Sequence, residues 1–73
     1  MKNIITLKVS KRELRKLPST MIYGEVAIAR RILNQRADQY LLKRPNLAIT
    51  SRTMVYDEPI ETATGYMNQM IIQ

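Results

Sequence analysis

The chain has 73 residues, 45% of them hydrophobic, and twelve Lys and Arg against six Asp and Glu give it a formal net charge of +6. A chain this short supports one hydrophobic core, so we expect residues 1–73 to form a single small domain. It contains no cysteine and no histidine, which excludes disulfides and removes the usual zinc ligands and the side chains most often used in acid–base and nucleophilic catalysis. We therefore expect a binding protein rather than an enzyme, with no cofactor and no metal.

No segment approaches the roughly 20 consecutive apolar residues that a helix needs to cross a bilayer. The apolar stretch at residues 3–8 is also too short for the hydrophobic region of a secretory signal. We expect a cytoplasmic protein that makes no contact with a membrane.

The first predicted element is a strand at residues 4–9. Its β-branched residues are typical of strands, and Ile5, Leu7 and Val9 fall on one face at the two-residue period. These three side chains are therefore predicted to face the core.

A short helix is predicted over residues 11–17. Ser10 stands three residues before Glu13, which is the capping-box spacing, in which the hydroxyl and the carboxylate each accept a hydrogen bond from the other residue's backbone. Pro18 ends this helix, because a proline disfavours the helical conformation of the residue before it.

A long amphipathic helix is predicted from about residue 20 to about residue 42, with a serine or threonine as its N-cap. Gly24 is expected to lower the stability of this helix by up to about 1 kcal/mol without interrupting it, and Pro45 prevents its continuation. At about 100° per residue, the apolar side chains gather on one face. This predicted stripe consists of Ile22, Val26, Ala29, Leu33, Ala37 and Tyr40.

The rest of the chain is rich in β-forming residues. Residues 47–50 and 53–56 predict two strands joined by a tight turn, and residues 57–59 predict a loop. Residues 65–72 suit a helix or a strand, and their alternating pattern favours a last strand. The sum is an α+β fold, in which one long amphipathic helix and a short helix pack on a small antiparallel sheet.

Charge is distributed unevenly along the chain. Residues 1–44 hold eleven of the twelve basic residues and three of the six acids, a net charge of +8, whereas residues 45–73 carry −2. Such a field attracts an anionic partner and speeds the encounter with it, whether that partner is nucleic acid or an acidic protein face.

The basic cluster within residues 7–19 is the strongest functional feature of the sequence. Two interpretations remain open: a surface that holds a polyanion, or the solvated side of a short basic helix. In the first, the basic side chains contact carboxylates or phosphates, and two arginines of the long helix extend the patch. The candidate partner-binding residues are Lys8, Lys11, Arg12, Arg15, Lys16, Arg30 and Arg31.

One alternative is a small basic DNA-binding repressor of the ribbon-helix-helix or helix-turn-helix kind. A strand followed by two helices is similar to the ribbon-helix-helix arrangement, in which paired N-terminal strands enter the major groove. Against this alternative, Ile4 stands where the strand needs a polar reader, and Pro18 cuts the first helix short. Residues 21–23 also offer few hydrogen-bonding groups to a base.

Over its full length, from MKNIITLKVSKRELRKL to YMNQMIIQ, the chain resembles the small regulators with which lytic bacteriophages take control of bacterial RNA polymerase. The likeness lies in size, charge and general sequence character rather than in a motif. It implies a transcription inhibitor and antiterminator that binds the host polymerase near the N-terminal part of the β′ subunit. The implied effects are loss of σ-dependent initiation and passage through terminators. We expect a monomer in the host bacterial cytoplasm, and a phage assembly protein is a further alternative.

Overall fold

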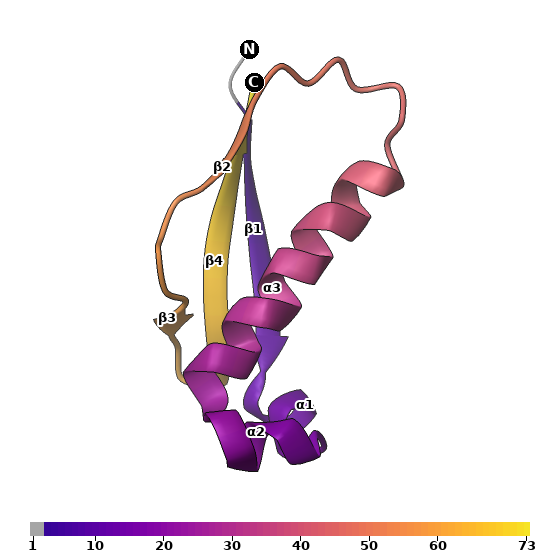
Figure 1. Ribbon diagram of the computed structural model, residues 1–73. Helices are drawn as coiled ribbons and strands as arrows, with labels where there is room; N and C mark the ends of the chain where they lie inside the picture. Colours follow the sequence, from indigo (N-terminus) through magenta and orange to yellow (C-terminus); the bar gives the residue numbers. More distant parts are fainter. Residues whose placement is uncertain (1–2) are drawn as a thin grey trace.

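The computed structural model describes residues 3–73, which combine three helices with a four-stranded antiparallel sheet (Figure 1). The predicted α+β fold is confirmed. None of the helices in this part of the chain has the length and apolar character that a membrane crossing requires. In chain order the elements are β1 (Asn3–Ser10), α1 (Lys11–Arg15), α2 (Pro18–Tyr23), α3 (Glu25–Leu42), β2 (Arg52–Met54), β3 (Ile60–Glu61) and β4 (Gly65–Ile72).

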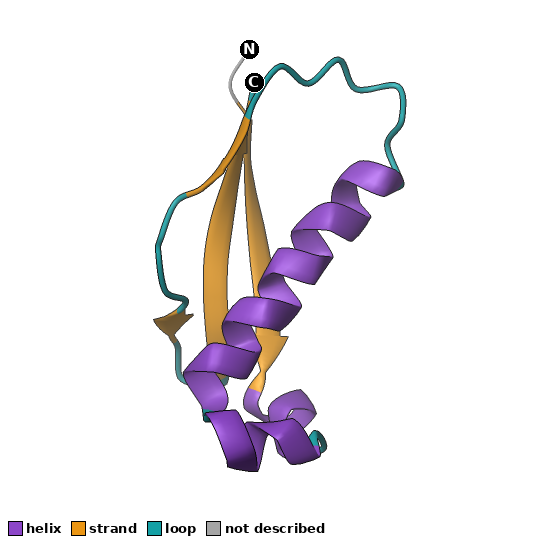
Figure 2. Cartoon of the chain, viewed as in Figure 1, coloured by secondary structure: helices purple, strands orange, loops and turns teal. Residues whose placement is uncertain are grey.

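The central strand of the sheet is β4. β1 pairs antiparallel with it along its whole length, from Asn3 opposite Ile72 to Ser10 opposite Gly65. β2 and β3 share the other edge, where β2 pairs with the end of β4 and β3 with its beginning. All the other strands therefore depend on β4 for their pairing (Figure 2).

A buried asparagine bridges the gap between β2 and β3. The side chain of Asn68, which is 2% exposed, accepts a hydrogen bond from the Tyr56 N–H (3.2 Å) and donates one to the Tyr56 carbonyl oxygen (3.1 Å). Its amide thus replaces a strand partner, and it satisfies polar groups that would be costly to bury unpaired. The bonds hold the loop of residues 55–59 against β4.

The core lies between α3 and one face of the sheet. Leu7 and Val9 are buried there and Ile5 packs against them, so the predicted inward face of the first strand is confirmed. Each fully buried leucine stabilises the fold by about 1.5–3 kcal/mol. The buried apolar residues are Leu7, Val9, Leu14, Ile28, Ala29, Leu33, Ala37, Tyr66, Met70 and Ile72.

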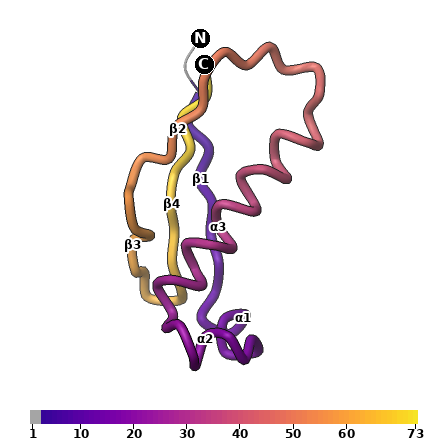
Figure 3. The backbone as a smooth tube through the Cα atoms, viewed as in Figure 1, coloured from indigo at the N-terminus to yellow at the C-terminus, as the bar shows by residue number. Residues whose placement is uncertain are grey.

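The long predicted helix is interrupted at Gly24, so the expectation of one continuous helix from about residue 20 is wrong. Gly24 has φ 89° and ψ 158°, a backbone conformation open almost only to glycine. Pro18 starts α2 instead, because its fixed φ and missing N–H suit the first helical position. The chain changes direction between α2 and α3 (Figure 3).

The interruption changes which residues are buried. Ile22, predicted to lie on the buried stripe, is 73% exposed, and Val26 is also exposed, whereas Ile28 joins the core. The rest of the stripe, from residue 29 to residue 40, packs inward as predicted. The amphipathic character of α3 is therefore confirmed, but it begins after Gly24.

A tyrosine of β4 fixes the start of α3. The Tyr66 hydroxyl donates a hydrogen bond to Glu25 Oε2 (2.9 Å). Burial and the neighbouring Glu25 carboxylate together raise the pKa of Tyr66 to about 12. The first turn of α3 is thus attached to the beginning of the central strand.

The predicted hairpin of residues 47–50 and 53–56 is wrong. Residues 47–50 form no strand, and β2 pairs with the end of β4. A two-residue turn of serine and arginine lacks the glycine or asparagine that tight hairpins favour, and the long strand at the chain end offers a better partner. The loop predicted at residues 57–59 and the last strand predicted at residues 65–72 are confirmed.

Gly65, the first residue of β4, lies against the end of β1. A Cβ atom at this position would stand 2.0 Å from the Val9 carbonyl oxygen and 2.8 Å from the Ser10 Cα. Because both neighbours are backbone atoms, we expect Gly65→Ala to lower the free energy of unfolding by about 1–3 kcal/mol, the usual range for overpacked sites. Urea denaturation measures this change.

Ala63→Ser, in the exposed turn just before β4, is the control and is expected to change the free energy of unfolding by less than about 0.5 kcal/mol. A Gly65→Ala protein as stable as this control would contradict the close approach of β4 to β1.

Candidate partner-binding surface

The helix α1 is held by its N-cap and by one leucine. The Ser10 Oγ accepts a hydrogen bond from the Glu13 N–H (3.1 Å), and Glu13 Oε2 accepts one from the Ser10 N–H (2.9 Å), so the predicted capping box is confirmed. The Leu14 side chain is completely buried. α1 ends at Arg15, two residues before its predicted end, and Lys16 is its C-cap. With Leu14 facing the core, the basic residues of α1 are left on its outer side.

Glu13 also connects α1 to α3. Arg36 Nη2 lies 2.5 Å from Glu13 Oε1, and Arg36 Nη1 donates to the carbonyl oxygen of Lys8. One guanidinium therefore joins α3, α1 and the outer edge of β1. The hydrogen bonds that Glu13 receives from the Ser10 backbone and from Arg36 hold the pKa of its carboxyl below the ordinary value.

Lys11, one of the candidate residues, forms an ion pair. Its Nζ lies 2.7 Å from Glu61 Oε2, and its backbone N–H donates to the carbonyl oxygen of Thr64 (2.9 Å). An exposed pair of this kind contributes only about 0–1 kcal/mol to stability. Its main consequence is positional, because it fixes the start of α1 beside the turn between β3 and β4.

A hollow of about 430 Å³ lies between α1 and that turn. Arg12 and Arg15 have no ion-pair partner within residues 3–73. Guanidinium groups bind carboxylates and phosphates through two parallel hydrogen bonds, so the hollow suits an anionic group. Three cations and no carboxylate line it: the lining residues are Ser10, Lys11, Arg12, Arg15, Ala63 and Thr64.

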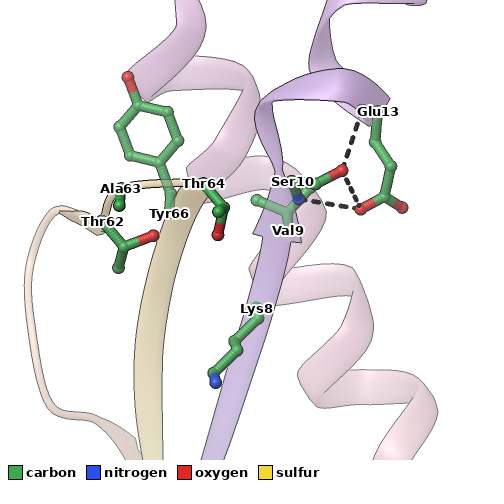
Figure 4. Close-up of a pocket in the computed structure, with 8 residues that line it drawn as sticks. All are labelled: Lys8, Val9, Ser10, Glu13, Thr62, Ala63, Thr64 and Tyr66. Atoms are coloured by element: carbon green, nitrogen blue, oxygen red, sulfur yellow. Dashed lines mark hydrogen bonds between the residues drawn. The ribbon is translucent and has the colours of Figure 1, made fainter.

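An adjoining hollow of about 410 Å³ shares part of this lining and includes Lys8 and Glu13 (Figure 4). Figure 4 shows the Glu13 carboxylate turned toward Ser10, while the Lys8 side chain points away from Ser10. Lys8 alternates with buried Leu7 and Val9 along β1, so it lies on the sheet face that α3 does not cover. It is therefore separate from the cations of α1.

Arg30 and Arg31 are exposed on α3 but do not lie beside the α1 cations. Arg36 marks the side of α3 that contacts α1. At about 100° per residue, Arg30 and Arg31 lie about 120° and about 140° around the helix from Arg36. The predicted candidates thus form two groups: an α1 group of Lys11, Arg12, Arg15 and Lys16, and an α3 pair, with Lys8 apart from both.

The carboxylates near α1 are engaged inside the molecule. Glu13 binds Ser10 and Arg36, Glu25 accepts the Tyr66 hydroxyl, and Glu61 binds Lys11. Farther along α3, Asp38 lies 2.6 Å from Arg52. In the described part of the chain, three carboxylates have no ion pair. One is Glu25, and the other two, Asp57 and Glu58, lie in the loop before β3. The positive field around α1 is therefore not compensated by a free local acid.

The pKa shifts of Glu13 and Tyr66 follow from structural hydrogen bonds and, for Tyr66, from burial. Across residues 3–73, no three acidic side chains are grouped so that they could hold a metal ion. Comparison of the chain with protein families, with characterised proteins and with solved structures finds no match.

One feature of this surface was missed by sequence reasoning. Met21, Ile22 and Tyr23 form the exposed end of α2, whereas the sequence placed residue 22 on a buried stripe. The signal was Gly24, which directly follows three large apolar residues and whose positive φ turns them away from the core.

The lowered pKa of Glu13 predicts a pH dependence of stability. Because the folded protein binds a proton at this carboxylate less readily than the unfolded chain, the stabilisation is present above the ordinary pKa of 4.5 and is lost as the pH falls through the lower folded value. We expect the free energy of unfolding to decrease as the pH falls below the ordinary value of 4.5, and Glu13→Gln to reduce this decrease. Urea denaturation at a series of pH values measures both, and parallel curves for the two proteins would contradict the role of the carboxylate.

Proposed function

We propose that the protein is a phage-type transcription regulator that binds host bacterial RNA polymerase and inhibits σ-dependent initiation. The observation that carries the proposal is the arrangement at α1, where Arg12 and Arg15 have no ion-pair partner among residues 3–73 and stand beside a hollow that none of the described carboxylates lines. The resemblance of the whole chain to phage regulators of the polymerase supports this partner. An acidic face of the enzyme would bring its carboxylates to the guanidinium groups of α1.

The proposed mechanism is stoichiometric binding. By occupying or reshaping a surface that the σ factor needs, the protein prevents promoter recognition without any chemical step. The resemblance points to the N-terminal part of the β′ subunit as the contact, and to antitermination as a second effect of the same complex. Long-range attraction by the α1 group speeds the encounter, and this contribution decreases as salt is added.

Direct nucleic-acid binding is the second candidate function, because the unpaired guanidinium groups of α1 also suit phosphate oxygens. The strand required by a ribbon-helix-helix protein, however, is paired along its whole length with β4 of its own chain. A helix-turn-helix motif needs hydrogen-bonding residues at the start of its second helix, whereas residues 21–23 are Met, Ile and Tyr. These features weigh against the ribbon-helix-helix and helix-turn-helix modes of DNA binding.

Charge reversal at α1 tests the proposal. We expect Arg12→Glu with Arg15→Glu to weaken binding to core polymerase about tenfold or more at about 0.1 M salt, because two attractive contacts become repulsive. Biolayer interferometry measures the affinity, and run-off transcription from a σ-dependent promoter measures the loss of inhibition.

Lys43→Glu with Arg44→Glu is the matched control, since it changes the net charge equally at the opposite end of α3 (Figure 1). Equal loss of affinity in the two proteins would mean that only total charge matters. If the wild-type protein does not bind nuclease-treated polymerase but binds DNA or RNA, the polymerase proposal is overturned in favour of the second candidate.

A further inference from the structure

The end of α2 exposes three large apolar side chains in succession. Met21 is 93% exposed, Ile22 73% and Tyr23 67%, and no residue of α2 is buried. Leu17 before this helix and Val26 after it are also exposed. Single exposed apolar residues are normal on protein surfaces, but several large ones exposed on and beside one short helix indicate a candidate interaction site. These five residues are called the α2 knuckle below.

The knuckle is formed by defined local structure. Pro18 begins α2, and the Gly24 N–H closes it with a hydrogen bond to the Thr20 carbonyl oxygen (2.8 Å). The next helix starts at once, since the Ile28 N–H donates to the Gly24 carbonyl oxygen (3.3 Å). The positive φ of Gly24 therefore fixes the orientation of α2 relative to α3, which directs the apolar side chains away from the core. A surface held in this way loses little conformational freedom when a partner covers it.

Cations flank the knuckle on both sides. α2 packs against α1 and against α3, and it lies between them at one end of the molecule (Figure 1). Lys16 directly precedes Leu17, and Arg30 stands one helical turn after Val26. The two acids in the segment from residue 11 to residue 37, at positions 13 and 25, are engaged internally. The surface therefore has an apolar centre and a basic border.

We propose that the α2 knuckle is the apolar anchor of the polymerase contact and that it enters an apolar groove bordered by carboxylates on the enzyme. This inference rests on the proposed function and adds the part of the surface that gives specificity. The basic border of the α2 knuckle requires acidic residues around the partner's groove. The apolar centre of the surface favours a protein partner, because the phosphate backbone that the cations would bind has no apolar surface to cover Met21 and Ile22. Interfaces of this kind concentrate their binding energy in a few central side chains inside a polar rim.

Met21→Gln with Ile22→Gln tests the inference, since glutamine keeps helix propensity and removes the apolar surface. We expect binding to core polymerase, measured by biolayer interferometry, to weaken about tenfold or more. The loss persists as salt is raised, in contrast to the loss caused by charge reversal at α1, because apolar contacts are not screened. Met21→Gln alone, at the most exposed of these positions, serves as the second variant if the double variant has a changed thermal unfolding curve.

Leu42→Gln with Leu47→Gln is the matched control, because these leucines are also exposed, Leu42 by 79%, and lie at the other end of α3. Wild-type affinity in the knuckle variants would overturn the inference and leave the proposed function in place. A wild-type protein that does not bind polymerase at all would overturn both. Sedimentation that shows a wild-type dimer and a monomeric knuckle variant would also overturn the inference, because the knuckle would then join two copies of this chain.

Discussion

The pairing of β4 with every other strand is the constraint on which the rest of the structure depends. This one segment supplies Tyr66, Asn68, Met70 and Ile72 to the buried side of the sheet, and its first residue meets the end of β1 so closely that only glycine fits. Because β1 and β4 pair although they are far apart in the sequence, the core closes only when these two segments have met. Contacts of such high sequence separation add a loop-closure cost and slow folding.

The same constraint positions the candidate partner-binding surface. Thr64, in the turn before β4, bonds the backbone of Lys11, and Glu61 of β3 bonds its side chain. The hydroxyl of Tyr66 holds the first turn of α3. α1 and the start of α3 are thus attached to one end of the central strand, and α2 connects them there. Each attachment uses a backbone group or a carboxylate. These carboxylates are therefore engaged in internal bonds, whereas Arg12 and Arg15 have no ion-pair partner within residues 3–73. Charge separation at the surface is therefore a consequence of how the fold is held together.

Local patterns in the sequence predicted the features that depend on near neighbours. The first strand follows from the alternation of Ile5, Leu7 and Val9, and the capping box from the spacing of Ser10 and Glu13. The interruption at Gly24 was not predicted, because the helical pattern continues through it and the usual penalty of a mid-helix glycine is small. Partners far apart in the chain, such as Lys11 with Glu61 or β2 with β4, leave no local signal. The α1 cations were therefore found from sequence, and the apolar knuckle beside them was not.

Hydrogen–deuterium exchange on the intact protein, with and without core polymerase, tests the central claim most directly. The claim is that the end of the molecule built by α1, α2 and the start of α3 is the surface that an acidic protein partner covers. It predicts slower exchange in peptides from residues 11–31 on addition of polymerase, and unchanged exchange in residues 43–58. Slower exchange confined to residues 43–58 or to the uncovered face of the sheet, with residues 11–31 unaffected, would contradict it.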